Sequence, residues 1–378
     1  MREKSLIKHE EWKGKIEVVS RCKIENKEEL AIAYTPGVSY PCEEIEKDPI
    51  NSYKYTRRGN LVGVITDGSA VLGMGNIGPL ASMPVMEGKC ILFKEFADID
   101  AFPICINEES SEKIIEIIKS IEGSFGAINL EDISAPRCFE IERKLNEICD
   151  IPVFHDDQHG TAIAVLAGLI NALKVVNKDN NVNIVVNGAG AAGIAIANLI
   201  YKYGYSNIVI CDRHGIITNE NSMNKYQLEA AVKFNKGKSG TLEEALKDSD
   251  VFIGVSAANI LSEEMIKVMK KDSIIFALAN PTPEIMPNLA LEFGARIVAT
   301  GRSDFKNQIN NLLVFPGIIK GALKGKINKI TKEIQIEVAK GIANYIDEKD
   351  LNEENIIPNI FDKKVVEIVS DIVCNFYK

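Results

Sequence analysis

The chain has 378 residues, 46% of them hydrophobic and 26% charged, which is ordinary for a folded globular protein and excludes a wholly disordered one. Its 44 basic and 53 acidic side chains give a formal net charge of −9, which argues against nucleic acid as the main partner. The N-terminus stays charged through Lys15, and the longest uncharged stretch, 180–201, is rich in Asn and Gly. We therefore expect no signal peptide, no membrane span and a cytoplasmic location.

Short apolar strands alternate with amphipathic helices along the chain. Apolar runs predict strands at 61–65, 127–130, 151–154, 183–187, 208–211, 251–255 and 273–278. Periodic apolar positions predict helices from Ser110 to Gly123, from Pro136 to Ile148, and over 161–176, 194–200 and 261–269. This alternation is typical of parallel sheets covered by helices on both faces. We predict an α/β protein with one domain at 1–152 and a second at 153–378, which ends in a helical return.

The segment after Asn187 reads GAGAAG and has the spacing G-x-G-x-x-G. It lies between an apolar strand and an apolar helix, which is the context of a dinucleotide-binding turn. Gly188, Gly190 and Gly193 would allow a tight turn and a close approach of the backbone to a pyrophosphate. Ala191 and Ala192 open the helix, whose N-terminus offers free N–H groups to phosphate. We predict a Rossmann-type, doubly wound parallel sheet, with a turn used only for packing as the alternative.

Asp212 ends the next strand, near the expected position of an acid that binds the ribose 2′-hydroxyl of a dinucleotide. This residue favours NAD as the cofactor. Arg213 follows directly and could hold a 2′-phosphate instead. The sequence therefore leaves NAD and NADP open.

Two expected strands end in paired carboxylates, Glu131-Asp132 and Asp156-Asp157. Because neighbouring parallel strands end at the same edge of a sheet, we expect these groups to converge. Ligands that are all oxygen select a hard cation, Mg²⁺ or Mn²⁺. The alternative for any single carboxylate is a helix cap or a solvated turn residue.

The run from His155 to His159 places two histidines four residues apart, as in the helix of zinc proteases. The usual Glu after the first His is Asp156 here, and the run meets Gly160, a poor residue for a helix interior. The eight cysteines include no C-x-x-C pair and are expected to be reduced thiols. We therefore rank a zinc site low.

Taken together, these residues resemble the malic enzyme family in its short bacterial form. The resemblance rests on motifs spread over residues 33–317 and in the family's order. They are AYTPGV from Ala33, LVGVITDGSAVLGMGNIG from Leu61, PVMEGKCILF from Pro84, NLEDISAP from Asn129, VFHDDQHGTA from Val153, the glycine turn, FALANPTPE from Phe276 and ATGRSDFKNQINNLLVFPG from Ala299.

The resemblance implies an N-terminal substrate and metal domain and oxidation of L-malate by NAD(P)⁺, with decarboxylation to pyruvate. By motif, Lys89 matches the family's general base and Tyr34 its general acid. Lys94 is the nearest rival to Lys89. The implied ligands of Mg²⁺ or Mn²⁺ are Glu131, Asp132 and Asp157, and Asp156 would orient Lys89 or a ligand.

The resemblance also assigns Asn280 to the substrate or the nicotinamide, and Asn310 and Asn311 to the substrate. Turn or cap duty is the alternative for these amides. Longer animal relatives carry an arginine for the substrate carboxylate where this chain has Ala70. The turn at 66–69 is our expected substitute.

Two other functions remain open at this point. One is a malolactic-type enzyme, or one acting on a related 2-hydroxy acid, and the other is a catalytically silent nucleotide-binding regulator. The resemblance implies a homodimer that acts on a small molecule, without nucleic acid or membrane as partner.

Overall fold

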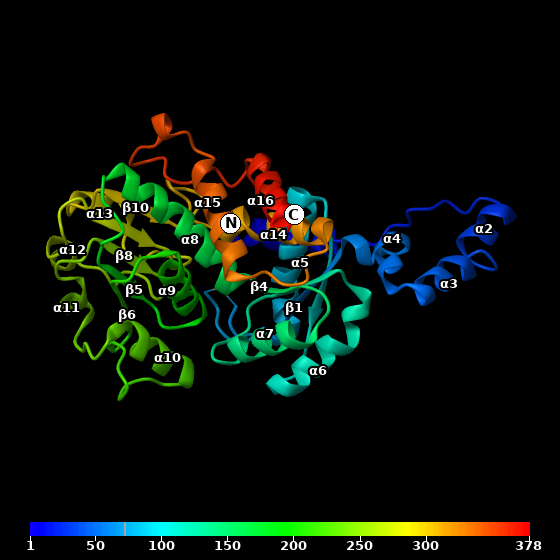
Figure 1. Cartoon of the computed structure of the whole chain (residues 1–378), viewed down its shortest axis with the longest axis horizontal. Helices are drawn as coiled ribbons and strands as arrows, with labels where there is room; N and C mark the ends of the chain where they lie inside the picture. Colours follow the sequence, from blue (N-terminus) through cyan, green and yellow to red (C-terminus); the bar gives the residue numbers. More distant parts are fainter. Residues whose placement is uncertain (72) are drawn as a thin grey trace.

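The computed structural model describes residues 1–71 and 73–378, and it contains two sheets (Figure 1). The first has the order β2-β1-β3-β4 and is parallel throughout. The second has the order β10-β9-β8-β5-β6-β7 and is parallel except for β7, which pairs with β6 in a hairpin. The predicted α/β class is confirmed. The strands are β1 (Leu61–Thr66), β2 (Asp100–Cys105), β3 (Ala127–Leu130), β4 (Val153–His155), β5 (Ile184–Asn187), β6 (Ile208–Asp212), β7 (Gly215–Ile216), β8 (Val251–Gly254), β9 (Ile274–Ala277) and β10 (Ile297–Thr300).

Helices flank both sheets and form the N-terminal and C-terminal segments. Before β1 come α1 (Arg2–Trp12), α2 (Lys27–Ala33), α3 (Ser39–Lys47) and α4 (Ser52–Tyr55). Around the first sheet lie α5 (Gly78–Ala97), α6 (Ser111–Ile121) and α7 (Arg137–Ile148). The remaining helices are α8 (Asp156–Val175), α9 (Ala191–Tyr203), α10 (Lys225–Ala230), α11 (Leu242–Leu246), α12 (Glu263–Lys267), α13 (Pro287–Glu292), α14 (Phe315–Gly325), α15 (Lys332–Asn344) and α16 (Lys363–Asn375).

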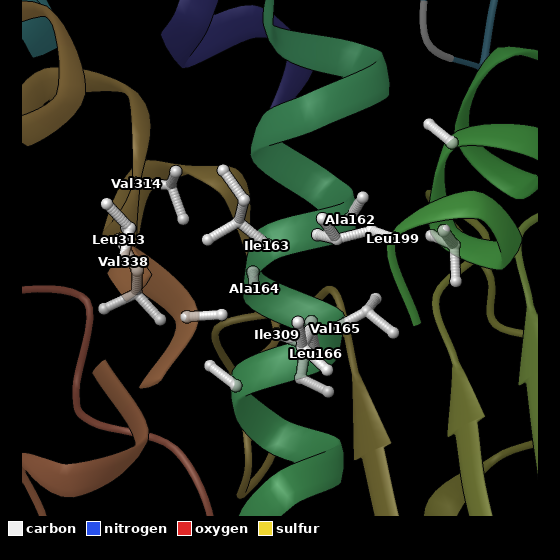
Figure 2. Packing of buried hydrophobic residues seen from close by; sticks show 14 of the residues in the cluster. Ala162, Ile163, Ala164, Val165, Leu166, Leu199, Ile309, Leu313, Val314 and Val338 are labelled. Carbon is white, nitrogen blue, oxygen red and sulfur yellow. The ribbon is translucent and has the colours of Figure 1, made fainter. Parts of the chain in front are cut away.

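Helix α8 runs between the two sheets and forms the centre of the largest core. Its residues 162–167 are completely buried against α9, α15 and the segment 309–314 (Figure 2). The sequence predicts a start near residue 161, but the helix begins at Asp156. Gly160 makes the earlier start possible, because a Cβ there would lie 1.9 Å from Asp156 Oδ1. None of the described helices, this one included, has the length and apolar character needed to cross a bilayer.

The C-terminal helices return to the first sheet. Helices α14 and α16 pack against each other and against α5, and the rings of Phe93 and Phe315 meet at 4.8 Å. Strand β4 pairs with β3 in the first sheet, immediately after the boundary that we predict between residues 152 and 153. The junction of the two sheets is therefore built from β4 and α8 together.

Residues 17–55 form an arm that extends from the body and carries α2, α3 and α4 (Figure 1). None of its residues is buried. Its base is tied to α5, where Lys15 donates its backbone N–H to Glu87 Oε2 at 3.0 Å. The arm nevertheless exposes large apolar side chains, namely Val18, Val19, Ile24, Leu30, Ile32, Tyr34, Val38, Tyr40, Ile50 and Tyr55.

Candidate active site

Lys89 lies at the centre of the site, with only 8% of its surface exposed. It projects from α5, whose apolar residues Met86, Cys90 and Phe93 anchor the helix in the core. The Lys89 ammonium lies 2.6 Å from Asp156 Oδ2 and 2.9 Å from Glu131 Oε1. Below it, the Phe315 ring centre lies at 4.1 Å. A single cation is thus held between two buried carboxylates.

The carboxylates come from two neighbouring strand ends, as predicted. Glu131 and Asp132 follow β3, and Asp156 and Asp157 form the first turn of α8 after β4. Asp157 Oδ2 accepts a hydrogen bond from the Asp132 N–H at 2.9 Å, and Glu131 Oε2 accepts one from Asn129 Nδ2 at 2.9 Å. The structure therefore brings Lys89, Glu131, Asp132, Asp156 and Asp157 into one cluster.

The cluster carries more negative than positive charge. Burial raises the pKa of Glu131, Asp156 and Asp157, and repulsion among the carboxylates raises the pKa of Glu131 and Asp156 further. Burial lowers the pKa of Lys89, but attraction to Asp156 and Glu131 outweighs this, so the net pKa is raised and the amine is protonated. The carboxylates of Glu131 and Asp156 thus contact one ammonium group and that of Asp157 lies nearby, and a further cation would relieve their repulsion.

The chemistry of these donors fits a hard divalent cation, because all of them are oxygen atoms and Asp156 Oδ1 is buried without a hydrogen-bond partner. Within 1–71 and 73–378, however, no three acidic, histidine or cysteine side chains already form a metal-binding group. The carboxylates would have to turn toward a bound cation, so metal ligation by Glu131, Asp132 and Asp157 stays a prediction.

The glycine turn joins β5 to α9. Gly188 follows β5 with a φ of +127°, and a Cβ on Gly193 would lie 1.7 Å from the Gly188 carbonyl oxygen. Gly190 is exposed, and nothing lies within 4 Å of its Cβ position. Ala191 begins α9 and packs against the core of the first sheet. The free N-terminus of α9, with Ala192 in its first turn, thus faces the junction of the two sheets.

Asp212 ends β6, as predicted. Its Oδ1 accepts a hydrogen bond from the His214 N–H at 2.7 Å, which closes the tight turn into β7. Arg213 is exposed on the same turn, and its Nε donates to His214 Nε2 at 3.2 Å. Both residues can face a ribose, so the geometry leaves the choice between NAD and NADP open.

The predicted asparagines fall into different roles. Asn311 Nδ2 donates to Asp156 Oδ2 at 2.6 Å and so joins the cluster, whereas Asn310 Oδ1 accepts from the Leu312 N–H at 2.9 Å and caps a short helix. Asn280 precedes a cis proline, and that proline faces Gly73 across the junction. Asn280 is therefore near the site, while Asn310 does what the alternative for these residues describes.

A cation that the sequence did not single out lies beside the 66–69 turn. The Arg137 Nη2 lies 2.5 Å from Asp67 Oδ2, and Ser69 Oγ accepts the Ser134 N–H at 2.9 Å. Ala70 donates its backbone N–H to the Asp132 carbonyl at 2.9 Å. Arg137 directly follows the NLEDISAP motif, and this position was the sequence signal that could have identified it as a site residue. Leu72, within the neighbouring motif, lies outside the described residues.

Tyr34 is placed apart from the cluster. It ends α2 on the arm and is 66% exposed. Among the described residues, no hydrogen bond or ring contact joins it to Lys89 or the carboxylates, and Figure 1 shows α2 at the far end of the arm. Within one chain, therefore, the predicted general acid does not join the predicted general base and metal ligands.

The two histidines do not form a zinc site. His155 is completely buried, and His159 Nε2 lies 2.9 Å from the Glu142 carboxylate. Glu142 also accepts hydrogen bonds from the His155 N–H and from Gln158 Nε2, each at 3.1 Å. The buried carboxylate of Glu142 thus holds the first turn of α8 in place through these hydrogen bonds. No sequence motif indicated this role.

Comparisons with known proteins cover nearly the whole chain. The malic enzyme N-terminal domain matches residues 13–113 and 107–146, and the malic enzyme NAD-binding domain matches 158–378. A bifunctional malic/malolactic enzyme of Bacillus subtilis is 50% identical over 99% of this chain and 92% of its own. An NADP-dependent malic enzyme of Escherichia coli is 46% identical over 95% of this chain and 50% of its own.

The crystal structure of an NAD-dependent malic enzyme from Thermotoga maritima superposes with a TM-score of 0.95 and 51% identity. The match covers 98% of this chain and 99% of that one. The two domain matches, the relatives and this superposition agree with one another on the family and the fold. The chain belongs to the malic enzyme family of NAD(P)-dependent oxidoreductases that oxidatively decarboxylate malate.

Proposed function

We propose that this chain oxidises L-malate with NAD⁺ or NADP⁺ and releases pyruvate and CO₂, in a reaction that requires Mg²⁺ or Mn²⁺. The observation that carries the proposal is Lys89, buried between Glu131 and Asp156. A surface lysine would have no reason to be buried between two carboxylates. An enzyme that removes the hydroxyl proton of a hydroxy acid requires such a group.

Lys89 takes the proton from the C2 hydroxyl of malate while the C2 hydride leaves. Glu131, Asp132 and Asp157 would hold a divalent cation, which would supply a Lewis acid for decarboxylation, and the glycine turn would hold the dinucleotide that accepts the hydride. Lys89 must be neutral to act, and positive charge near the three carboxylates would cancel the attraction that now raises its pKa. Asp156 and Asn311 keep the amine in place.

After CO₂ leaves, C3 of the enol product needs a proton, for which Tyr34 is the proposed donor. We infer that Tyr34 reaches the cluster of a second copy in a homodimer. The support is the exposed arm, which presents apolar side chains that a partner would cover, and the exposed phenol at its tip. Each site would then take its base from one chain and its acid from the other.

The test is an absorbance assay at the nicotinamide band with L-malate, either dinucleotide and either cation. Lys89→Ala should abolish hydride transfer and leave dinucleotide binding unchanged. The control is Lys94→Ala on the same helix, an exposed lysine paired with Asp98 and Asp100, which should keep its activity. Normal turnover by Lys89→Ala would remove this lysine from the mechanism, and loss in both variants would show that α5 itself had been disturbed.

The same assay ranks the cofactors. Asp212 predicts a higher kcat/KM with NAD, whereas dominance of Arg213 would favour NADP.

Product analysis addresses a second function, because the Bacillus subtilis relative is named a bifunctional malic/malolactic enzyme. Pyruvate with reduced dinucleotide supports the main proposal, and lactate without net reduction supports the malolactic one.

A further inference from the structure

A cavity of about 260 Å³ lies behind the proposed active site, where both parts of the chain meet. Phe139 of α7 comes from the predicted first domain, and the second domain contributes His159 of α8, residues of α9 and α10, and the start of α15. Neither the glycine turn nor any carboxylate of the cluster lines it. The cavity is therefore separate from the proposed malate and dinucleotide sites.

The walls of this cavity carry two lysines. Lys233 Nζ donates to Asn198 Oδ1 at 2.7 Å. The Lys332 ammonium has no hydrogen-bond or ion-pair partner among the described residues, and burial lowers its pKa while Glu142 opposes and Lys233 adds to that effect. Glu229 is the one acidic residue of the lining, and it is exposed. The lining thus favours an anion.

Two further polar atoms at this cavity have no partner in the described part of the chain. They are Tyr226 Oη and His159 Nδ1, and both are buried. Both atoms are sealed from solvent, so an occupant of the cavity would not reach them. The charged side chains of the lining are those of Lys332, Lys233 and Glu229.

The remaining wall is apolar. The rings of Phe139 and Tyr226 meet at 4.6 Å, and Phe234, Ile194 and Ala195 complete the lining. Inorganic phosphate has no apolar part to cover this surface, whereas an organic acid does. We propose that the cavity is a binding site for a small organic carboxylate, whose charged end meets Lys332 and whose apolar body packs against Phe139 and Phe234.

Isothermal titration of the whole protein, without dinucleotide or metal, tests this site with benzoate as the probe. Benzamide has the same shape without the charge, and it should bind at least about tenfold more weakly. Lys332→Met keeps most of the side chain and removes the ammonium, so benzoate affinity should fall at least about tenfold. Lys329→Met, an exposed lysine just before α15 that does not line the cavity, should bind like wild type.

Tyr226→Phe keeps the ring packed against Phe139 and removes a hydroxyl that is sealed from the cavity, so its benzoate affinity should stay like that of wild type. Excess L-malate should not displace benzoate, because the two sites differ. The proposal is overturned if benzoate does not bind, if Lys332→Met binds it like wild type, if malate displaces it, or if phosphate binds there and benzoate does not. These readouts need no turnover and are independent of the proposed function.

Discussion

At the scale of single residues, the carboxylates around Lys89 and the carboxylate of Glu142 differ in how well they are paired. Those of the cluster repel one another around Lys89, whereas Glu142 is completely satisfied by three donors of the α8 turn. Burial raises the pKa of Glu142, but the interactions with His159 and His155 together outweigh burial, so the net pKa is lowered. The ionised form of Glu142 therefore stabilises the fold.

Glu142→Gln should lower the free energy of unfolding by about 1–3 kcal/mol at pH 7, because a buried charge-assisted acceptor is lost. Since the folded pKa lies below the ordinary value of 4.5, the contribution is complete above that pH and disappears as the pH falls through the folded value. Urea unfolding from pH 7 downward should show the difference from wild type narrowing only below about pH 4.5. Glu147→Gln, on the exposed side of α7, is the control. A difference that persists unchanged in acid would contradict this account.

At the scale of elements, most of the alternation of strands and helices was readable because most strands are buried on both faces and most helices on one. Strand β2 was missed, because it is only partly buried and lacks a continuous apolar run. The proximity of the two carboxylate pairs could also be predicted, because neighbouring parallel strands end at a common edge of the sheet. The start of α8 could not be predicted, because glycine disfavours a helix interior in general. Only the structure shows that any larger residue at Gly160 would collide with the Asp156 side chain. Asn310 and Asn311 are adjacent and identical, and only the tertiary fold separates the cap from the partner of Asp156.

The glycine turn gives a prediction at this scale. Gly193→Ala would drive a Cβ into the Gly188 carbonyl, so it should destabilise the protein by about 1–3 kcal/mol and abolish dinucleotide binding. Gly190→Ala has open space around its Cβ, so the free energy of unfolding should stay within about 0.5 kcal/mol of wild type. Its dinucleotide affinity should still fall, because the methyl group would stand where the backbone approaches phosphate. Thermal unfolding and dinucleotide titration measure both, and a stable, fully binding Gly193→Ala would refute the packing argument.

At the scale of the whole molecule, the arm is the part that sequence reasoning could not place. Its motif identified Tyr34, but local patterns do not reveal whether a side chain serves its own chain or a partner. The exposed arm supports the second possibility, in which two chains exchange arms across a two-fold axis.

Mixing two inactive variants tests this exchange. Tyr34→Phe and Lys89→Ala homodimers should each form pyruvate slowly or not at all. After unfolding and refolding together in equal amounts, about half the dimers are mixed, and each mixed dimer has one intact site, so about a quarter of wild-type activity should return. If Tyr34 serves its own chain, every site keeps one defect and no activity returns. Size-exclusion chromatography of the variants confirms that dimers are present.

The first turn of α8 has an evolutionary consequence. Asp156 and Asp157 face the cluster, while Gln158 and His159 face Glu142 and the cavity behind it. Because one helical turn carries both sets of side chains, a substitution that shifts its backbone would move the carboxylates and part of the cavity wall together. Evolutionary change of the cavity that preserves catalysis is therefore expected at its other walls, on α9, α10 and α15.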